Sequence, residues 1–402
     1  MNKRRGARSK METLKAKALK MHKDHQGKLS VQAKVEVANE EQLSLAYSPG
    51  VAEPCLEIKR NPDLAYTYTM KRHTVAVVTD GSAVLGLGNI GAQAALPVME
   101  GKAVLFKNFA GVDAFPICLD TQDVAEIIRT VTQLAPTFGG INLEDIAAPN
   151  CFIIEEKLKQ ALDIPVFHDD QHGTAIVTLA GLVNALKLVE KDFETIKVVV
   201  NGAGAAGVAI VKLLAHFGVQ DTILCDSKGA IYQGRPFGMN PVKDQVAQYT
   251  NKTSIQGDLK AAIQGADVFI GVSLGGLVDQ EMIRSMNPDP IIFAMANPDP
   301  EINPTDAIKA GARVVGTGRS DYPNQVNNVL AFPGIFKGAL SVKASDINEA
   351  MKVAAVYAIA GLIEEEDLHD DYVIPNPFDN RVAQVVAAAV AEAAKATGVA
   401  RI

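Results

Sequence analysis

The stretch "IKVVVNGAGAAGVAIVKLLAHFG" limits the possible folds more than any other part of the sequence. It places Gly202, Gly204 and Gly207 in G-x-G-x-x-G spacing between a β-branched run and an amphipathic run. Such glycines permit a tight turn, the close approach of a pyrophosphate and helix-on-strand packing, while the helix N-terminus offers free N–H groups to an anion. The stretch therefore predicts a dinucleotide-binding loop formed by Gly202, Ala203, Gly204, Ala205 and Gly207.

Asp226 ends the next β-branched run, "TILCD", 24 residues after Gly202. An acid at that place bonds the adenine-ribose hydroxyls of NAD⁺, and its charge repels the 2′-phosphate of NADP⁺. Lys228 and Lys243 follow in the sequence, and a lysine near the ribose would attract that phosphate as a point charge. We expect NAD⁺ to be slightly preferred, with measurable use of NADP⁺.

β-Branched runs alternate with longer amphipathic runs, as expected for helices on both faces of a parallel sheet. With 402 residues the chain is long enough for about two or three domains. We therefore predict an α/β protein with an N-terminal α/β domain over residues 1–165. Residues 166–402 are predicted to form a Rossmann-like, doubly wound dinucleotide-binding domain with C-terminal helices.

Helical segments are expected in the sequence before and after the N-terminal α/β domain's predicted strands. The chain through about residue 45 is predicted to be helical, with Leu14, Ala18 and Met21 on one face for packing or for contact with a second copy. After the break near residue 165, "TAIVTLAGLVNALKLVE" predicts a helix. Thr174 is expected to cap it by accepting from free N–H groups of the first turn.

Composition excludes several classes of protein. The net charge of −7 gives no footprint for nucleic acid, and we interpret the basic start "MNKRRGARSK" as a solvated arm. No stretch approaches the ~18 apolar residues of a membrane-spanning helix, so we expect a cytoplasmic protein without membrane partners. The scattered cysteines predict reduced, mostly packed thiols; they are Cys55, Cys118, Cys151 and Cys225.

Four predicted strands end in acids, at Asp80, Asp145, Asp170 and Asp226. Ligands of open α/β sheets bind at the carboxyl ends of the strands, so these acids are expected to face a crevice. Glu144 and Asp145 with Asp170 would make an all-oxygen cluster that suits Mg²⁺ or Mn²⁺. Solvated acids or a helix cap explain the same residues equally well at this point.

The run "FHDDQHGTA" raises the question of zinc, because His168 and His172 flank Asp169 and Asp170. We disfavour zinc, since "IPVF" reads as a strand that enters a loop and no cysteine lies near in sequence. Each histidine is more simply a packing residue or a neighbour of the metal ligands.

A set of motifs, in order from about residue 17 to the C-terminus, resembles the malic enzymes in their short bacterial form. These motifs are "AYSPGVAEPC", "VVTDGSAVLGLGNIG", "GKAVLFK", "INLEDIAAPN", "FHDDQHGTA", "NGAGAAG", "FAMANPDPEI" and "NNVLAFPG". The resemblance implies divalent-metal-dependent oxidative decarboxylation of L-malate to pyruvate and CO₂, with reduction of NAD⁺ or NADP⁺, by a homodimer.

The resemblance also implies roles for individual side chains. It makes Tyr47 the general acid, Lys102 the general base, and Asp169 an acid beside the lysine. Tyr47 and Lys102 are not distinctive by themselves, because each needs burial or charged neighbours to move protons at neutral pH.

Metal and substrate contacts follow from the same motifs. The resemblance makes Glu144, Asp145 and Asp170 the ligands of Mn²⁺ or Mg²⁺. Asn297 and Asn328 match side chains that contact malate or the nicotinamide ribose.

One motif departs from the longer malic enzymes. These carry an arginine in "VTDG-x-R" for a substrate carboxylate, where this chain has Ser82 and Ala83. The resemblance therefore does not identify the cation that pairs with malate.

Two other functions are compatible with the sequence. A malolactic-type protein would use the same site, retain NADH and release lactate; such proteins are expected to be longer. A catalytically silent, nucleotide-sensing regulator would share the fold, but the intact Tyr47, Lys102 and acids weigh against it.

Overall fold

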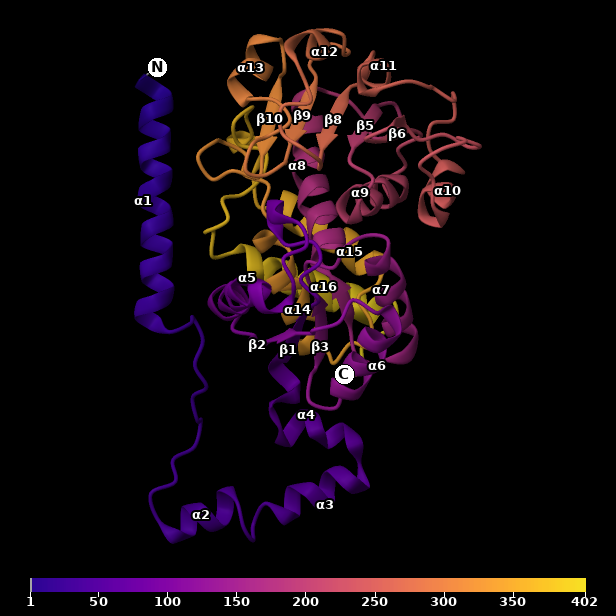
Figure 1. Ribbon diagram of the computed structural model, residues 1–402. Helices are drawn as coiled ribbons and strands as arrows, with labels where there is room; N and C mark the ends of the chain where they lie inside the picture. Colours follow the sequence, from indigo (N-terminus) through magenta and orange to yellow (C-terminus); the bar gives the residue numbers. More distant parts are fainter. Residues whose placement is uncertain (1) are drawn as a thin grey trace.

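The computed structural model describes the backbone from residue 2 to residue 402 and the side chains from residue 13 onward (Figure 1). The side chains of the basic start therefore lie outside the described residues. A first parallel sheet has the strand order β2-β1-β3-β4. Its strands are β1 (Thr74–Thr79), β2 (Asp113–Cys118), β3 (Gly140–Leu143) and β4 (Val166–His168).

The second sheet has the order β10-β9-β8-β5-β6-β7 and is parallel except for the edge strand β7. Its strands are β5 (Lys197–Asn201), β6 (Asp221–Asp226), β7 (Gly229–Ala230), β8 (Val268–Gly271), β9 (Ile291–Ala294) and β10 (Val314–Thr317). The order reverses direction between β5 and β8. In open α/β sheets this switch point is where ligands bind.

Helices cover both sheets. The helices up to the second sheet are α1 (Asn2–His25), α2 (Glu40–Ala46), α3 (Ala52–Arg60), α4 (Ala65–Tyr68), α5 (Ala92–Leu105), α6 (Val124–Leu134), α7 (Asn150–Ala161) and α8 (Thr174–Leu188). Those that follow are α9 (Ala205–His216), α10 (Pro241–Ala247), α11 (Leu259–Ile263), α12 (Gln280–Arg284), α13 (Pro304–Lys309), α14 (Phe332–Ser341), α15 (Glu349–Ala360) and α16 (Val382–Ala396).

Short helical turns lie between these elements. The 3₁₀ turns are η1 (Pro62–Leu64), η2 (Met70–His73), η3 (Leu85–Leu87), η6 (Asn328–Leu330) and η7 (Glu365–Asp367). Two π turns, η4 (Phe106–Ala110) and η5 (Asp169–Gly173), continue directly from α5 and into α8.

The alternation of side chains along the central strands produces the layers. Val198 and Val200 of β5 pack with α8 and α9, whereas Val199 packs with α11 and α12 on the opposite face. Because a strand points successive side chains to opposite faces, a fully buried strand has an apolar layer on both sides. The predicted doubly wound α/β arrangement is confirmed.

The C-terminal helices return to the first sheet rather than staying with the second. The Phe106 ring lies 4.7 Å from that of Phe332 and 5.4 Å from that of Phe336, both on α14. Val75 and Val77 of β1 belong to the same core cluster as Val198 of β5. One continuous core therefore crosses the boundary predicted at residue 165, and that boundary stays a prediction.

An N-terminal arm, from α1 through α3, lies mostly apart from the sheets and contacts α5 where the backbone N–H of Lys28 donates to Oε2 of Glu100 at 3.1 Å. Figure 1 shows α1, α2 and α3 set apart from the sheets, and α2 and α3 bury none of their residues. The chain is helical over α1 and α2 but not between them, so the predicted helix through residue 45 is interrupted. Leu14 is 67% exposed and Met21 43%. The apolar face of α1 therefore has no cover from this chain's own body.

One helix-cap prediction is wrong. Thr174 does not cap α8, because η5 runs into that helix and Gly173 precedes it without a capping side chain. The Thr174 hydroxyl instead donates to Oδ1 of Asn328 at 3.2 Å. Among the described residues, no helix is both long enough and apolar enough to cross a membrane.

Candidate active site

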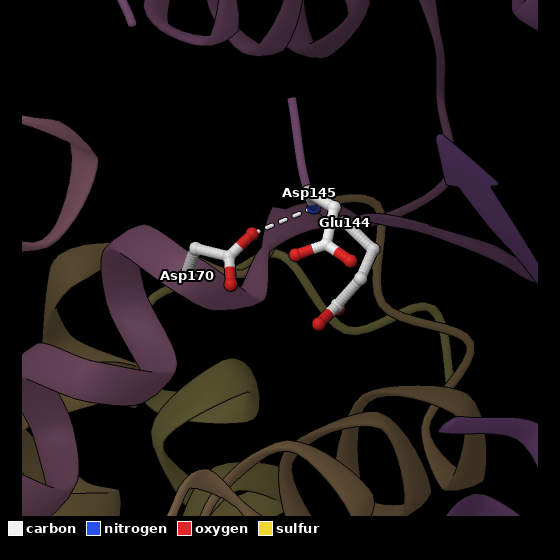
Figure 2. Close-up of side chains that lie close together, drawn as sticks. All are labelled: Glu144, Asp145 and Asp170. Carbon is white, nitrogen blue, oxygen red and sulfur yellow. Dashed lines mark hydrogen bonds between the residues drawn. The ribbon is translucent and has the colours of Figure 1, made fainter. Parts of the chain in front are cut away.

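The ends of β3 and β4 bring three carboxylates together. The two strands are parallel neighbours with Leu143 opposite His168, so the acids that follow each strand emerge at the same edge. Figure 2 shows Glu144, Asp145 and Asp170 converging; one carboxylate oxygen from each lies within 4.8 Å of the corresponding oxygens of the other two. Oδ2 of Asp170 also accepts from the backbone N–H of Asp145 at 2.7 Å.

A backbone turn explains how two sequence neighbours face the same point. Asp145 has φ 55°, in the left-handed region that side chains other than glycine seldom adopt. On a regular strand Glu144 and Asp145 would point to opposite faces. The turn at Asp145 redirects its side chain toward Glu144, and such strain is concentrated at functional sites.

The cluster fits a hard divalent cation. Glu144 and Asp145 are buried, and Oδ2 of Asp145 has no hydrogen-bond partner among the described residues. Burial is the larger cause and repulsion from Asp170 the second that raise the pKa of Asp145 to about 7. Burial also raises the pKa of Glu144 well above its usual range. Oxygen ligands with unmet charge suit Mg²⁺ or Mn²⁺, and neither histidine nor cysteine belongs to the cluster.

Lys102 on α5 lies beside this cluster. Its Nζ donates to Oδ2 of Asp169 at 2.7 Å, lies 2.8 Å from Oε1 of Glu144, and lies 4.2 Å from the centre of the Phe332 ring. Burial by itself lowers the pKa of the Lys102 ammonium, but Asp169, Glu144 and Asp170 together raise it above its ordinary value. Lys102 is therefore charged while these acids carry their full negative charge.

Asp169 and Asn328 complete the surroundings of the lysine. Asp169 is fully buried, and its Oδ2 also accepts from Nδ2 of Asn328 at 3.1 Å. Asn328 was predicted from the motif to contact malate or the ribose. In the structure its side chain donates to Asp169, the same carboxylate that accepts a hydrogen bond from Lys102.

Tyr47, by contrast, does not lie with Lys102. It follows α2 on the N-terminal arm and is 70% exposed, and the arm leads away from the body (Figure 1). Its hydroxyl has no hydrogen bond to any of the described residues. The fold of a single chain brings Lys102 next to the carboxylates of Asp169 and Glu144, but it does not bring Tyr47, the predicted general acid, to them.

The glycine loop has the geometry that the sequence predicted. Gly202 has φ 125°, and a Cβ atom on Gly207 would overlap the carbonyl oxygen of Gly202. A Cβ on Gly204 would meet open space, which leaves room for a ligand against the backbone. The helix α9 begins there with no capping side chain, so its first N–H groups are available to an anion such as a pyrophosphate.

Asp226 is not a free acid. Its carboxylate accepts from the Arg235 guanidinium at 2.9 and 2.5 Å, from Lys243 at 2.6 Å, and from the backbone N–H of Lys228 at 2.8 Å. Burial raises the pKa of Asp226, but the bonds from Arg235 and Lys243 outweigh it and hold that pKa well below the usual range. Sequence reasoning missed Arg235, whose only local signal is the turn "YQGR" after β7.

Two loops from different sheets meet at Asn297. This exposed residue follows β9, and a Cβ on Gly86 would lie 2.9 Å from the Asn297 carbonyl oxygen. Ser82, which precedes Ala83 at the position of the missing arginine, donates to Oδ1 of Asp80 at 2.5 Å and accepts from the backbone N–H of Ala147 at 2.8 Å. Ser82 therefore shapes the strand-end loop.

Comparisons with known proteins identify the family of the chain. The model of the family described as "Malic enzyme, N-terminal domain" matches residues 26–159, and that of "Malic enzyme, NAD binding domain" matches residues 171–395. A "Bifunctional malic/malolactic enzyme" of Bacillus subtilis is 69% identical over 97% of this chain and 95% of the relative. An "NAD-dependent malic enzyme" of Geobacillus stearothermophilus is 57% identical over 93% of this chain and 78% of the relative.

Solved structures extend the likeness to the whole fold. The crystal structure of malic enzyme from Pyrococcus horikoshii has a TM-score of 0.92 at 48% identity, covering 96% of this chain and 92% of that chain. The structure of an NAD-dependent malic enzyme from Thermotoga maritima has a TM-score of 0.90 at 51% identity, covering 93% and 98%. With two family models that together match most of its length, this chain belongs to the malic enzyme family.

Proposed function

We propose that this chain oxidatively decarboxylates L-malate to pyruvate and CO₂ while reducing NAD⁺ or NADP⁺. The observation that carries this proposal is the position of Lys102 between Asp169 and Glu144, at the edge of a three-carboxylate cluster. A base beside a hard-cation site is what removal of a hydroxyl proton and stabilisation of an enolate require.

Each side chain then has a physical task. Lys102 accepts the C2 hydroxyl proton as hydride leaves, once the charge of the neighbouring acids is countered, and Asp169 holds its ammonium in place. A divalent cation held by Glu144, Asp145 and Asp170 would act as the Lewis acid for the C2 oxygen and for the enolate that follows CO₂ loss. Tyr47 protonates C3 of that enolate.

We further propose that Tyr47 reaches the active site of a second copy of this chain in a homodimer. The arm that carries Tyr47 leads away from its own body, and apolar residues of the arm are exposed, among them Leu14, Val35 and Leu45. Burial of such residues against a partner is favourable by about 25 cal/mol per Å². In a two-fold dimer the exchange would be reciprocal.

Mixed dimers test this arrangement directly. Tyr47→Phe and Lys102→Ala subunits, each inactive alone, are co-expressed with different affinity tags and the hybrid is isolated. If Tyr47 acts on the partner, one of the two sites pairs Tyr47 with Lys102 and the hybrid keeps about half the wild-type activity. A hybrid as inactive as its parents would place Tyr47 in the site of its own chain.

For the cofactor, we propose that both NAD⁺ and NADP⁺ are used and that the ion pairs of Asp226 shift the balance toward NADP⁺. The expectation of a slight preference for NAD⁺ assumed a free carboxylate. Because Arg235 and Lys243 are paired with Asp226, this carboxylate would repel a 2′-phosphate less. The same two cations would lie near the ribose that Asp226 is expected to bind. Relatives of both kinds, "NAD-dependent" and "NADP-dependent", match this chain.

The central experiment is a spectrophotometric assay with L-malate and Mn²⁺, run separately with each cofactor. Formation of NADH or NADPH in step with pyruvate is expected. Absence of malate turnover with either cofactor, in the presence of bound metal, would exclude the proposal.

A malolactic activity is the second candidate, because of the 69% identity to the Bacillus subtilis bifunctional relative. That relative has nearly the same length as this chain, so the expectation that malolactic-type proteins are longer does not separate the two functions. Proton NMR of the products would detect lactate formed from malate with catalytic NAD⁺. Pyruvate with stoichiometric NADH would exclude the malolactic route.

A further inference from the structure

One carboxylate, that of Glu155 on α7, holds both ends of the turn that carries Asp169 and Asp170. Its Oε1 accepts from the backbone N–H of His168 at 3.2 Å. Its two oxygens lie 2.8 and 2.9 Å from Nε2 of His172. His168 and His172 flank the two aspartates, so a side chain outside the metal cluster fixes the segment from which Asp170 and Asp169 project.

The orientation of the His172 ring is set from its other side by Lys352 on α15. Nζ of Lys352 lies 3.1 Å from Nδ1 of His172. An ammonium group can only donate, so Nδ1 is the acceptor and the proton of the ring is on Nε2, which donates to Glu155. Lys352, His172 and Glu155 thus form one directed series of hydrogen bonds.

This series joins three parts of the fold that are distant in sequence. Glu155 lies on α7 of the first sheet region, His172 in η5, and Lys352 on a C-terminal helix. Lys352 is only 3% exposed and also pairs with Glu349 at 2.7 Å. All three residues line a cavity of about 620 Å³, on the side of η5 where Gln171 also lies.

A buried lysine is costly unless it is paired. Among the described residues, the partners of the Lys352 ammonium are His172 and Glu349, and neither Lys102 nor the three-carboxylate cluster is one of them. Its burial is therefore explained by the bond to His172 and the ion pair with Glu349.

We propose that Glu155, His172 and Lys352 are positioning residues that hold the Asp169–Asp170 turn in the geometry that presents Asp170 to the metal and Asp169 to Lys102. The proposal rests on the proposed function for its catalytic readout. Side chains that orient ligands in this way change metal affinity or activity by about 10- to 100-fold when they are removed.

The experiment measures Mn²⁺ affinity of the metal-free full-length protein by isothermal titration calorimetry, together with kcat and both Michaelis constants. The variants are His172→Ala, Lys352→Met and His172→Gln. The glutamine side-chain N–H replaces the Nε2 donor to Glu155 but not the acceptor for Lys352.

For His172→Ala we expect an unchanged stoichiometry of Mn²⁺, about 10-fold weaker Mn²⁺ binding or more, and a lower kcat. The KM for the nucleotide should not change, because the nucleotide loop lies between β5 and α9. His172→Gln should recover part of the loss. Lys352→Met, which keeps the apolar stem, should weaken Mn²⁺ binding in the same direction.

Matched controls come from the same cavity. Glu156→Gln and Lys212→Met change exposed residues of α7 and α9 that line the cavity without touching His172, and both should bind Mn²⁺ as the wild type does. Circular dichroism and melting temperature identify any variant that fails to fold.

Folded His172→Ala and Lys352→Met proteins with wild-type Mn²⁺ affinity and kcat would overturn the proposal. So would equal losses in His172→Gln and His172→Ala, since the donated hydrogen bond would then have no role. If wild-type protein binds Mn²⁺ but does not turn over malate, the proposed function fails, and the Mn²⁺ affinities still decide the positioning role.

Discussion

Oδ1 of Asp169 lies so close to Gly173 that a Cβ atom on that residue would overlap it. Both residues belong to η5, and the same carboxylate accepts from Lys102 through Oδ2 at 2.7 Å. The absence of a side chain at Gly173 is therefore a condition for the lysine to have its partner.

Gly173→Ala is expected to displace Asp169 and so lower malate turnover by ~10²-fold or more, because misplacement of a catalytic group by about 1 Å costs that much. The measurement is kcat with saturating malate and Mn²⁺. The control is Gly101→Ala, next to Lys102, whose new Cβ would meet only the Lys28 ammonium, at 3.3 Å. Wild-type turnover in Gly173→Ala would show that Asp169 can move without consequence.

Asp170→Asn should abolish activity at ordinary Mn²⁺ concentrations, because a neutral amide replaces one of the anionic ligands. Excess Mn²⁺ should restore part of the rate. Calorimetric titration with Mn²⁺ gives the affinity independently of turnover. Unchanged affinity and kinetics would remove Asp170 from the ligand set.

The stability of the metal-free protein should fall as pH rises. Burial and Asp170 raise the pKa of Asp145 from 3.8 to about 7, so the folded state binds this proton more tightly than the unfolded chain does. A raised carboxyl pKa gives stability that is fully present below the unfolded value and is lost as pH rises through the folded value. The loss should therefore occur between about pH 4 and 7.

Mn²⁺ should reverse that loss, since it binds the ionised acids of the folded state. At 100 times its Kd a ligand stabilises by about 2.7 kcal/mol. Thermal melts should show a larger rise in Tm on adding Mn²⁺ at pH 8 than at pH 5, where protons compete. Equal rises at the two pH values would contradict a site built from Glu144, Asp145 and Asp170.

Cofactor choice should depend on Lys243. Lys243→Ala removes a cation bound to Asp226 and should lower kcat/KM for NADP⁺ at least tenfold, about 1.4 kcal/mol, with a smaller effect on NAD⁺. Lys228→Ala, which leaves the backbone N–H of that residue in place, is the companion variant. Equal losses with both cofactors in Lys243→Ala would mean that the lysine stabilises the loop and does not select the phosphate.

Tyr47→Phe should separate the two halves of the reaction. Loss of a general acid costs about 10²-fold or more, and the enol step alone needs this proton. We expect malate turnover to fall by that amount while reduction of oxaloacetate by the reduced cofactor survives better. Equal damage to both reactions would contradict the role of Tyr47.

Sequence by itself determined the features that depend on neighbours along the chain. The glycine loop follows from the spacing of Gly202, Gly204 and Gly207, because turn geometry and helix packing are local. The acids of the metal cluster follow from their place after predicted strands, because parallel strands end at one edge of a sheet.

Tertiary structure decided which distant side chains meet. No spacing rule pairs Lys352 with His172, 180 residues earlier, or Arg235 with Asp226 across the turn after β6. The motif assigned Tyr47 a role, but only the tertiary structure showed that Tyr47 follows a helix, α2, that lies apart from the sheets. Such pairings depend on how helices pack on the sheets, and packing is a property of the whole chain.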